Sequence, residues 1–371
     1  MAESLYDVII IGSGPAGLTA GIYTSRAALK TLLFAGSPWG GQLQLTTDVE
    51  NYPGFPEGIL GPELMQKMRK QAERFGVEII DQKATNIDVT KKPFAVSFGK
   101  ESRDAKSVII ATGADTKWLG VPGENKFIGK GVSSCAPCDA FFYKGKRVIV
   151  VGGGDSAMEE ALVLTKFAET VTIVHRRDSF KASKIMQERV MKHPKINVLW
   201  NTEVVEVMGD QKVTTVRLKT KKLEVRSSKI DNEVGPIDGL KNGEKNQISK
   251  NEQIQIQDQS SNFKFQTSTI PIDGIFVAVG HTPNTEIFKG KIALDEKGYV
   301  KKVQSSKFKV QNEKGEVIGN RFPSMTSVEG VFVAGDVHDY HYKQAVTAAG
   351  YGCEAALEVE RWLENETGNK E

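Results

Sequence analysis

The feature that most constrains this chain is a β-branched run followed by a glycine-rich loop and an apolar helical stretch, a pattern that occurs twice. The first copy covers residues 7–28, with its loop at 12–17. The second copy covers residues 147–167, with its loop at 152–157, about 140 residues further on. Strand, glycine loop and helix open a nucleotide-binding α/β domain, and the spacing favours two such domains over a short-period repeat.

A chain of 371 residues is long enough for two or three domains. Three more strands that end in glycine are predicted at 107–111, 274–279 and 331–334. Between 219 and 268 the composition changes to Lys, Asn, Gln and Ser with isolated apolar residues two apart, which indicates a long exposed β-hairpin or a partly disordered insertion. A second polar stretch at 304–321 predicts another surface extension.

Composition and charge disfavour several classes of protein. No run of about 18 apolar residues is present, so we expect no membrane-spanning helix, and the amino-terminal residues lack the basic segment of a signal peptide. A net charge of +3 gives only a weak field, so we expect no nucleic-acid partner. Three cysteines cannot make a disulfide framework, but two of them form a C-x-x-C, which in an intracellular protein indicates redox chemistry or metal binding.

The first glycine loop, with Gly12, Gly14 and Gly17, fits the G-x-G-x-x-G pattern of dinucleotide-binding sites. Glycine permits the tight turn and the close approach of a pyrophosphate, and the helix that follows offers N–H groups and a positive dipole. A plain structural turn could carry the same pattern, but the strand and helix around it favour a nucleotide. The usual acidic residue about 20 positions later is missing, because the next strand ends at Ala35, so the ribose must be contacted differently.

The second loop is followed by a strand that ends in basic residues. Gly152, Gly154 and Ala157 form the loop pattern, and residues 171–174 lead into His175-Arg176-Arg177. An acidic residue here would bind the 2′-hydroxyl of NAD, whereas two guanidinium groups favour charge-assisted recognition of a 2′-phosphate. A solvated basic turn is the alternative, but the position relative to the glycine loop predicts NADP(H).

The C-x-x-C pair is Cys135 and Cys138, followed directly by Asp139. Two cysteines at this spacing can close a small disulfide ring, and nearby charge can lower the pKa of one thiol. A zinc site would need two more ligands, and the five histidines are scattered, so we expect no resident metal. Asp139 could donate a proton to a departing thiolate if burial raises its pKa, or it could simply cap a helix.

Seven motifs occur together in this order, and they resemble the low-molecular-weight (bacterial-type) thioredoxin reductases. The motifs are Gly12–Gly17, Gly40-Gly41-Gln42, Asn51-Tyr52-Pro53-Gly54, Cys135–Phe142, Gly152–Ala157, His175-Arg176-Arg177 and Val331–Val337. The resemblance covers nearly the whole chain except the two polar stretches. It implies two doubly wound, Rossmann-like α/β domains, with an NADPH domain (116–283) inserted into a discontinuous FAD domain (1–115 and 284–371).

The resemblance also implies site residues, by position. FAD would be bound by Gly12, Ser13, Gly14, Pro15, Ala16, Gly41, Gln42, Asn51, Thr112, Gly113, Asp336, Lys343, Gln344 and Ala345. NADPH would be bound by Gly152, Gly154, Asp155, Ser156, Ala157, His175, Arg176 and Arg177. The catalytic residues would be Cys135, Cys138 and Asp139.

The activity implied by the resemblance is electron transfer from NADPH through FAD to a Cys135–Cys138 disulfide and then to thioredoxin. A cytoplasmic homodimer is expected with it. Two other functions stay open at this point. One is a flavoprotein that reduces a glutaredoxin-like or peroxiredoxin-linked carrier, and the other is a nucleotide-sensing flavoprotein without catalysis. Intact Cys135, Cys138 and Asp139 argue against the second.

Overall fold

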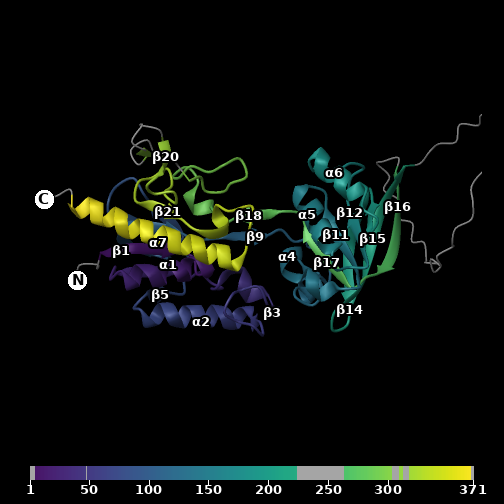
Figure 1. Cartoon of the computed structure of the whole chain (residues 1–371), viewed down its shortest axis with the longest axis horizontal. Helices are drawn as coiled ribbons and strands as arrows, with labels where there is room; N and C mark the ends of the chain where they lie inside the picture. Colours follow the sequence, from purple (N-terminus) through teal and green to yellow (C-terminus); the bar gives the residue numbers. More distant parts are fainter. Residues whose placement is uncertain (1–4, 47, 224–262, 303–308, 312–316, 369–371) are drawn as a thin grey trace, which may run out of the picture. The chain divides into compact units, whose positions relative to one another are not determined.

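The computed structural model describes residues 5–46, 48–223, 263–302, 309–311 and 317–368 (Figure 1). The chain divides into two compact units. The first unit consists of Met1–Lys117 and His281–Glu371, and the second is Trp118–Gly280. The second unit is therefore inserted into the first, and the predicted α/β class with two doubly wound units is confirmed. The sequence placed the boundaries at 115/116 and 283/284.

The first unit is built on a sheet of order β5-β2-β1-β8-β7-β6, with β21 also paired to β8. Its strands are β1 (Tyr6–Ile11), β2 (Thr31–Phe34), β5 (Glu78–Ile80), β6 (Asn86–Asp88), β7 (Phe94–Phe98), β8 (Glu101–Ile110) and β21 (Val331–Val333). The pairs of β1 with β2 and β8, of β2 with β5 and of β21 with β8 are parallel. Strand β1 is almost entirely buried, as its continuous apolar sequence requires for a central parallel strand covered on both faces.

Among the described residues of the first unit, the α-helices are α1 (Pro15–Arg26), α2 (Gly61–Arg74) and α7 (Ala345–Gly368). Helices α1 and α7 lie side by side (Figure 1). A Cβ atom at Gly352 of α7 would lie 2.1 Å from the carbonyl oxygen of Ala16, so only glycine permits this close approach. The start of α1, which carries the first glycine loop, is thereby fixed against α7.

The second unit contains a fully parallel sheet of order β10-β17-β11-β12-β13. Its strands are β10 (Val132–Ser133), β11 (Arg147–Gly152), β12 (Thr170–Val174), β13 (Ile196–Leu199) and β17 (Gly274–Ala278). Its helices are α3 (Glu124–Phe127), α4 (Ala136–Asp139), α5 (Asp155–Leu164) and α6 (Lys184–Met191). Buried apolar residues of α5 pack against β11 and β12, which holds the second glycine loop at the carboxyl end of β11.

A three-stranded antiparallel sheet completes the second unit, with β14 (Thr202–Gly209), β15 (Val213–Leu223) and β16 (Phe263–Pro271). Leu223 lies opposite Phe263, so the ends of β15 and β16 pair within the polar stretch that the sequence sets at 219–268. The remainder of that stretch, 224–262, lies outside the described residues. In the stretch 304–321, β19 (Lys309–Gln311) and β20 (Val317–Asn320) pair antiparallel, and residues 304–308 and 312–316 are outside the description.

Short pairs of strands complete the fold: β3 (Asp48–Val49) with β4 (Ile59–Leu60), and β9 (Ala114–Thr116) with β18 (His281–Pro283). The β9–β18 pair joins the two chain segments at which the first unit is interrupted. Within the residues that the structure describes, no helix combines the length and the apolar character needed to cross a membrane.

Candidate active site

The first glycine loop is shaped by two contacts that exclude side chains. A Cβ atom at Gly12, whose φ is +115°, would lie 2.2 Å from the carbonyl oxygen of Ala111, and one at Gly17 would lie 1.9 Å from that of Gly12. Gly14, in contrast, has nothing within 4 Å of the position a Cβ would take. Helix α1 begins at Pro15 directly after Gly14, without a side-chain cap. The loop therefore leaves an open space beside uncapped helix N–H groups, as an anionic ligand requires.

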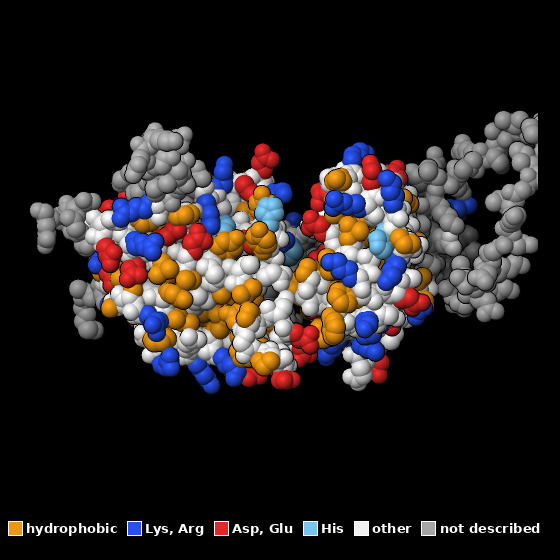
Figure 2. All heavy atoms as spheres, viewed as in Figure 1, with side chains coloured by type: hydrophobic (Ala, Val, Ile, Leu, Met, Phe, Trp, Pro, Cys, Tyr) orange, Lys and Arg blue, Asp and Glu red, His pale blue; other side chains and the backbone are white. Residues whose placement is uncertain are grey.

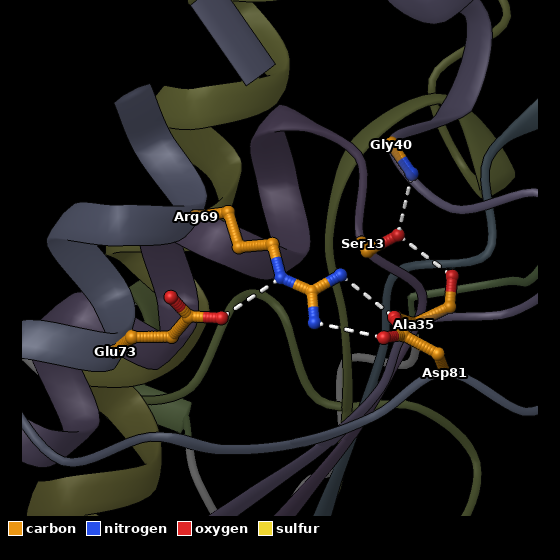
Figure 3. A network of polar contacts seen from close by, with 6 residues as sticks. All are labelled: Ser13, Ala35, Gly40, Arg69, Glu73 and Asp81. Carbon is orange, nitrogen blue, oxygen red and sulfur yellow. Dashed lines mark hydrogen bonds and ion pairs between the residues drawn. The ribbon is translucent and has the colours of Figure 1, made fainter. Parts of the chain in front are cut away.

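Ser13 turns its hydroxyl into the protein. The buried Oγ donates to the carbonyl of Ala35 over 2.6 Å and accepts from the amide of Gly40 over 2.7 Å (Figure 3). These bonds tie the first glycine loop to the end of β2 and to the turn before Gly41. Only the backbone of Ser13 is thus available to a ligand.

A cluster of ion-paired side chains lies near the turn that precedes Gly41. Arg69 donates to both carboxylate oxygens of Asp81, over 2.7 and 2.9 Å, and to Glu73 over 2.9 Å (Figure 3). Its guanidinium also lies 4.8 Å from the ring centre of Trp39, which precedes Gly40. We interpret Arg69 as a support for the turn at 36–40, because its donors are already engaged by carboxylates.

The loop containing Gly41 meets the first glycine loop. A Cβ atom at Gly41 would lie 3.4 Å from the Cα of Gly14. Gln42 donates to Asp115 over 3.0 Å, and Asp115 also accepts from the side chain of Asn284 over 3.2 Å.

Asn284 continues this network to the segment after β8. Its amide nitrogen donates to Gly113 O over 3.0 Å, its side chain donates to Thr112 O over 3.1 Å, and its carbonyl accepts from Thr112 Oγ1 over 2.7 Å. The structure therefore brings Gln42, Thr112 and Gly113 together. Asp115 and Asn284, which were not predicted, hold them in place, and the only sequence signal for Asn284 was its position after a strand ending in glycine.

Asp336 follows β21 in the first unit. Gly335, with φ of +77°, would place a Cβ 2.9 Å from Ala16, so Asp336 lies close to the first glycine loop. Burial and then the negative charge of Asp339 raise the pKa of Asp336 to about 7. Its Oδ1 atom is buried and makes no hydrogen bond to the described residues. A buried carboxyl oxygen without a partner is costly, which supports a hydroxyl-bearing ligand at this position.

Asp339 organises the next turn. Its carboxylate accepts from the amides of His341 and Tyr342, over 2.9 and 3.1 Å, and from that of Lys343 over 3.3 Å. Lys343 adopts a left-handed conformation with φ of +48°, and its Nζ lies 3.0 Å from Nδ1 of His281. Burial, followed by the charges of Lys343 and Lys117, lowers the pKa of His281 to about 4, so the imidazole is neutral and can accept from the ammonium.

Two more predicted residues meet across the sequence. The side chain of Asn51 donates to Gln344 over 3.2 Å, and Ala345 is the first residue of α7. The first unit therefore brings together the predicted residues of the first loop, those after β8 and those before α7. They belong to elements that meet at the carboxyl ends of the parallel strands of this unit. This edge is where ligands bind in open parallel sheets.

The second glycine loop repeats the geometry of the first. A Cβ at Gly152 would lie 2.7 Å from that of Ala157, which is fully buried, whereas Gly154 has nothing within 4 Å. A Cβ at Gly153 would lie 2.2 Å from the ring of His175. His175 is buried, with Nε2 2.9 Å from Ser179 O, so its ring packs against the glycine loop.

The predicted basic residues Arg176 and Arg177 are exposed after β12. The segment they begin is held at three points. Asn201 N donates to Arg177 O over 3.0 Å, Lys181 N donates to Gly153 O over 2.8 Å, and Asp155 accepts from Ser183 N and Oγ, both over 2.8 Å.

The backbone bond from Lys181 to Gly153 holds the backbone of this exposed lysine at the glycine loop. Its sequence signal, a cation four residues after Arg177, was missed. Ser156, in contrast, is exposed on the first turn of α5 and makes no contact that decides its role.

Cys135 and Cys138 form a disulfide in the second unit, with their Cα atoms 5.3 Å apart. Cys135 precedes the single turn α4 and is half-buried, while Cys138 is exposed. The bonded pair supports the redox interpretation over the zinc interpretation. Phe141, three residues after Cys138, is 62% exposed.

Asp139 is mostly buried beside the disulfide. Burial raises its pKa, while the hydrogen bond that Ser133 donates to its Oδ2 over 2.5 Å lowers it. The same Ser133 Oγ accepts from the amide of Cys135 over 3.1 Å. Asp139 makes no side-chain hydrogen bond that caps α4 or the turn after it, so the geometry does not support the helix-cap alternative. Its role as a proton-transferring group stays a prediction. Ser133 was not foreseen.

Comparison with known proteins gives consistent results. Residues 6–352 match the family described as pyridine nucleotide-disulphide oxidoreductase. The chain is 44% identical over 362 residues to a thioredoxin reductase of Mycolicibacterium smegmatis, with 98% of each chain covered. Among solved structures, the thioredoxin reductase from Giardia duodenalis aligns with a TM-score of 0.76 and 38% identity, over 98% of this chain and 100% of that one. The thioredoxin reductase from Streptococcus pyogenes MGAS5005 aligns with a TM-score of 0.77 and 34% identity over the same shares.

Proposed function

Because the chain belongs to the pyridine nucleotide-disulphide oxidoreductases, and within them to the thioredoxin reductases, we propose that it reduces thioredoxin with electrons from NADPH, by way of FAD. The observation that carries this proposal is the Cys135–Cys138 disulfide beside the buried Asp139. The names of the relatives favour thioredoxin over a glutaredoxin-like or peroxiredoxin-linked carrier.

We assign FAD to the first unit. The open space at Gly14 and the uncapped start of α1 suit its pyrophosphate, and the buried, unpartnered oxygen of Asp336 suits a ribitol hydroxyl. We assign Lys343, whose ammonium lies beside His281, and the network of Gln42 with Asp115 to the flavin end. Bound FAD would accept a hydride from NADPH and pass the electron pair to a disulfide.

We assign NADPH to the second unit. Its pyrophosphate would lie at Gly154 and the start of α5, and its 2′-phosphate at Arg176 and Arg177 with Lys181 close to the same loop. His175 contributes by filling the space under Gly153, which keeps the basic segment against the glycine loop.

The cysteines would carry the last step. Two electrons and two protons convert the disulfide to the thiols of Cys135 and Cys138. A thiolate of this pair attacks the thioredoxin disulfide and displaces one thioredoxin thiolate, and the second cysteine then attacks the mixed disulfide. The Cys135–Cys138 bond forms again, thioredoxin leaves as a dithiol, and one NADPH has been oxidised. Asp139, with its raised pKa, is suited to giving the departing thiolate a proton.

We also propose a homodimer and a cytoplasmic location. Hydrophobic side chains gather on the face of the first unit around α1 and α7 (Figure 2), and Tyr23 and Val346 on these helices are exposed. Such a patch suits a second copy of the chain, which light scattering would detect. A reductase that keeps its dithiol reduced suits a compartment in which thiols are reduced.

The test uses the purified holoenzyme with NADPH and thioredoxin. The protein should be yellow, with one FAD per chain, and Cys138→Ser should accept electrons into the flavin yet fail to reduce thioredoxin. Cys353→Ser is the control, because Cys353 is the free cysteine and lies on α7, outside the disulfide. Full thioredoxin reduction by Cys138→Ser would refute the electron path.

A further inference from the structure

Each backbone N–H of the C-x-x-C turn, from Cys135 to Asp139, donates a hydrogen bond to an acceptor. Cys135 N donates to Ser133 Oγ over 3.1 Å, and Cys138 N and Asp139 N donate to Cys135 O over 3.2 and 3.1 Å. Pro137 has no N–H. The remaining amide, that of the fully buried Ala136, donates to the Oε2 atom of Glu160 on α5.

Glu160 thus brings a carboxylate to the residue that lies between the two cysteines and directly follows Cys135. In reactive cysteine motifs the thiolate is usually stabilised by a free helix-start amide or by a nearby cation. Here the amide at the start of α4 is directed to a carboxylate instead. A negative charge at this position disfavours a second negative charge on sulfur.

Other charged groups lie on the elements around the turn. Asp139 lies on α4 itself, Tyr143 on the next turn has its pKa raised by burial and by the charges of Asp139 and Asp273, and Glu159 on α5 is exposed. Asp155, also on α5, is engaged by Ser183. The cation contacting the following segment, Lys146, donates to Phe142 O over 2.6 Å.

We propose that Glu160 is a positioning residue that destabilises the thiolate form of the reduced Cys135–Cys138 pair. Its carboxylate accepts the hydrogen bond of the Ala136 amide and so places a negative charge beside that amide. The consequence is a dithiol that stays protonated until substrate arrives, and a thiolate that is more nucleophilic once formed. Protonated thiols are also less open to oxidation to sulfenic acid. This inference rests on the proposed function, since it concerns the same redox pair.

The test is Glu160→Gln, which keeps an acceptor for the amide and removes the charge. Glu159→Gln is the matched control, because it removes the same charge from the adjacent, exposed position of α5. Both are made with Cys353→Ser, so that thiolate absorbance reports only on the redox pair. The thiolate pKa of the reduced holoenzyme should fall by about one unit in Glu160→Gln and stay unchanged in Glu159→Gln.

Equilibration with glutathione buffers gives a second readout. At a pH above the thiolate pKa measured for both proteins, the tenfold stabilisation of the thiolate should make the potential of the pair about 30 mV less negative in Glu160→Gln. At a pH well below both measured values, where the reduced pair is a dithiol, the difference should vanish. A merely structural role for Glu160 would not produce this dependence on pH.

Glu160→Ala is the second variant, in case the amide side chain disturbs folding. Unchanged thiolate pKa and potential in both Glu160 variants, or a rise in pKa, would overturn the inference. The proposed function would survive that result, because thioredoxin reduction is measured separately on the wild type. Conversely, a wild type that fails to reduce thioredoxin but shows the shift in Glu160→Gln would refute the function and leave the inference standing.

Discussion

Replacing Arg176 and Arg177 together by alanine should remove most of the preference for NADPH over NADH. Both side chains are exposed at the end of β12, and their backbone is held by the bond from Asn201 to Arg177 O and by the buried ring of His175. The two substitutions therefore change charge while leaving the anchors of the segment intact. The loss should fall on NADPH, which carries the 2′-phosphate, and spare NADH.

The size of the effect follows from the exposure of the two side chains. Hydrogen bonds to charged groups are worth about 1.5–3 kcal/mol each, so two would set a preference of roughly 10²–10⁴-fold in kcat/KM. Exposed ion pairs contribute less because solvent and salt screen them. Since Arg176 and Arg177 are both exposed, we expect a preference near the lower end, about 10²-fold.

The assay compares kcat/KM for NADPH and NADH in the wild type and in the double variant, at low and at physiological salt. The variant should lose activity with NADPH, retain its activity with NADH and show a weaker salt dependence with NADPH. Arg217→Ala is the control, because Arg217 lies on β15 of the three-stranded sheet rather than after β12, and pairs with Glu206. A wild type that uses NADH as well as NADPH would show that these arginines do not read the 2′-phosphate.

Three further predictions test the fold around the sites. Gly153→Ala should lower the melting temperature and weaken NADPH binding, because its Cβ would clash with the buried ring of His175, and overpacking costs about 1–3 kcal/mol; calorimetry measures both, and an unchanged affinity would contradict the role of that ring. Burial raises the pKa of Glu358 from 4.5 to about 7. The folded state therefore holds a proton that the unfolded chain has released, and the stability should fall as pH rises from about 4.5 to 7. Glu358→Gln should flatten that fall in thermal melts, and an unaltered slope would refute the assignment. Joining β15 to β16 by Asn-Gly in place of residues 224–262 should leave FAD content and flavin reduction unchanged, since the strands already pair at their ends; a rise in KM for thioredoxin alone would instead identify the segment as a docking arm.

Local patterns predicted the elements that carry the chemistry. The β-branched runs before the two glycine loops are β1 and β11, and the C-x-x-C spacing fits the disulfide that is present. These signals succeed because a turn or a small ring depends on residues that are adjacent in sequence. The two helices start earlier than predicted, at Pro15 and Asp155, because each helix begins directly after Gly14 or Gly154 rather than after the whole motif.

The supporting contacts could not be predicted because they join distant residues. Asn51 and Gln344 are 293 positions apart, Asp115 and Asn284 are 169 apart, and Glu160 reaches the amide of Ala136 across 24 positions. Each depends on how strands and helices pack, which no local pattern encodes. In a sequence, a carboxylate on a helix is usually interpreted as a solvated surface charge, so no sequence pattern indicated a role for Glu160.

The first helical positions after the two glycine loops distinguish the sites that we propose for FAD and NADPH. In α1 the first residue is Pro15, which carries no charge and lacks an N–H that would be unpaired anyway. In α5 it is Asp155, whose carboxylate is held by Ser183 at the positive end of the helix. A phosphate approaching α5 therefore meets a negative charge that α1 does not present. We expect the exposed cations Arg176, Arg177 and Lys181 to offset this repulsion, so that the basic segment of the second unit would serve the whole glycine loop and not the 2′-phosphate alone.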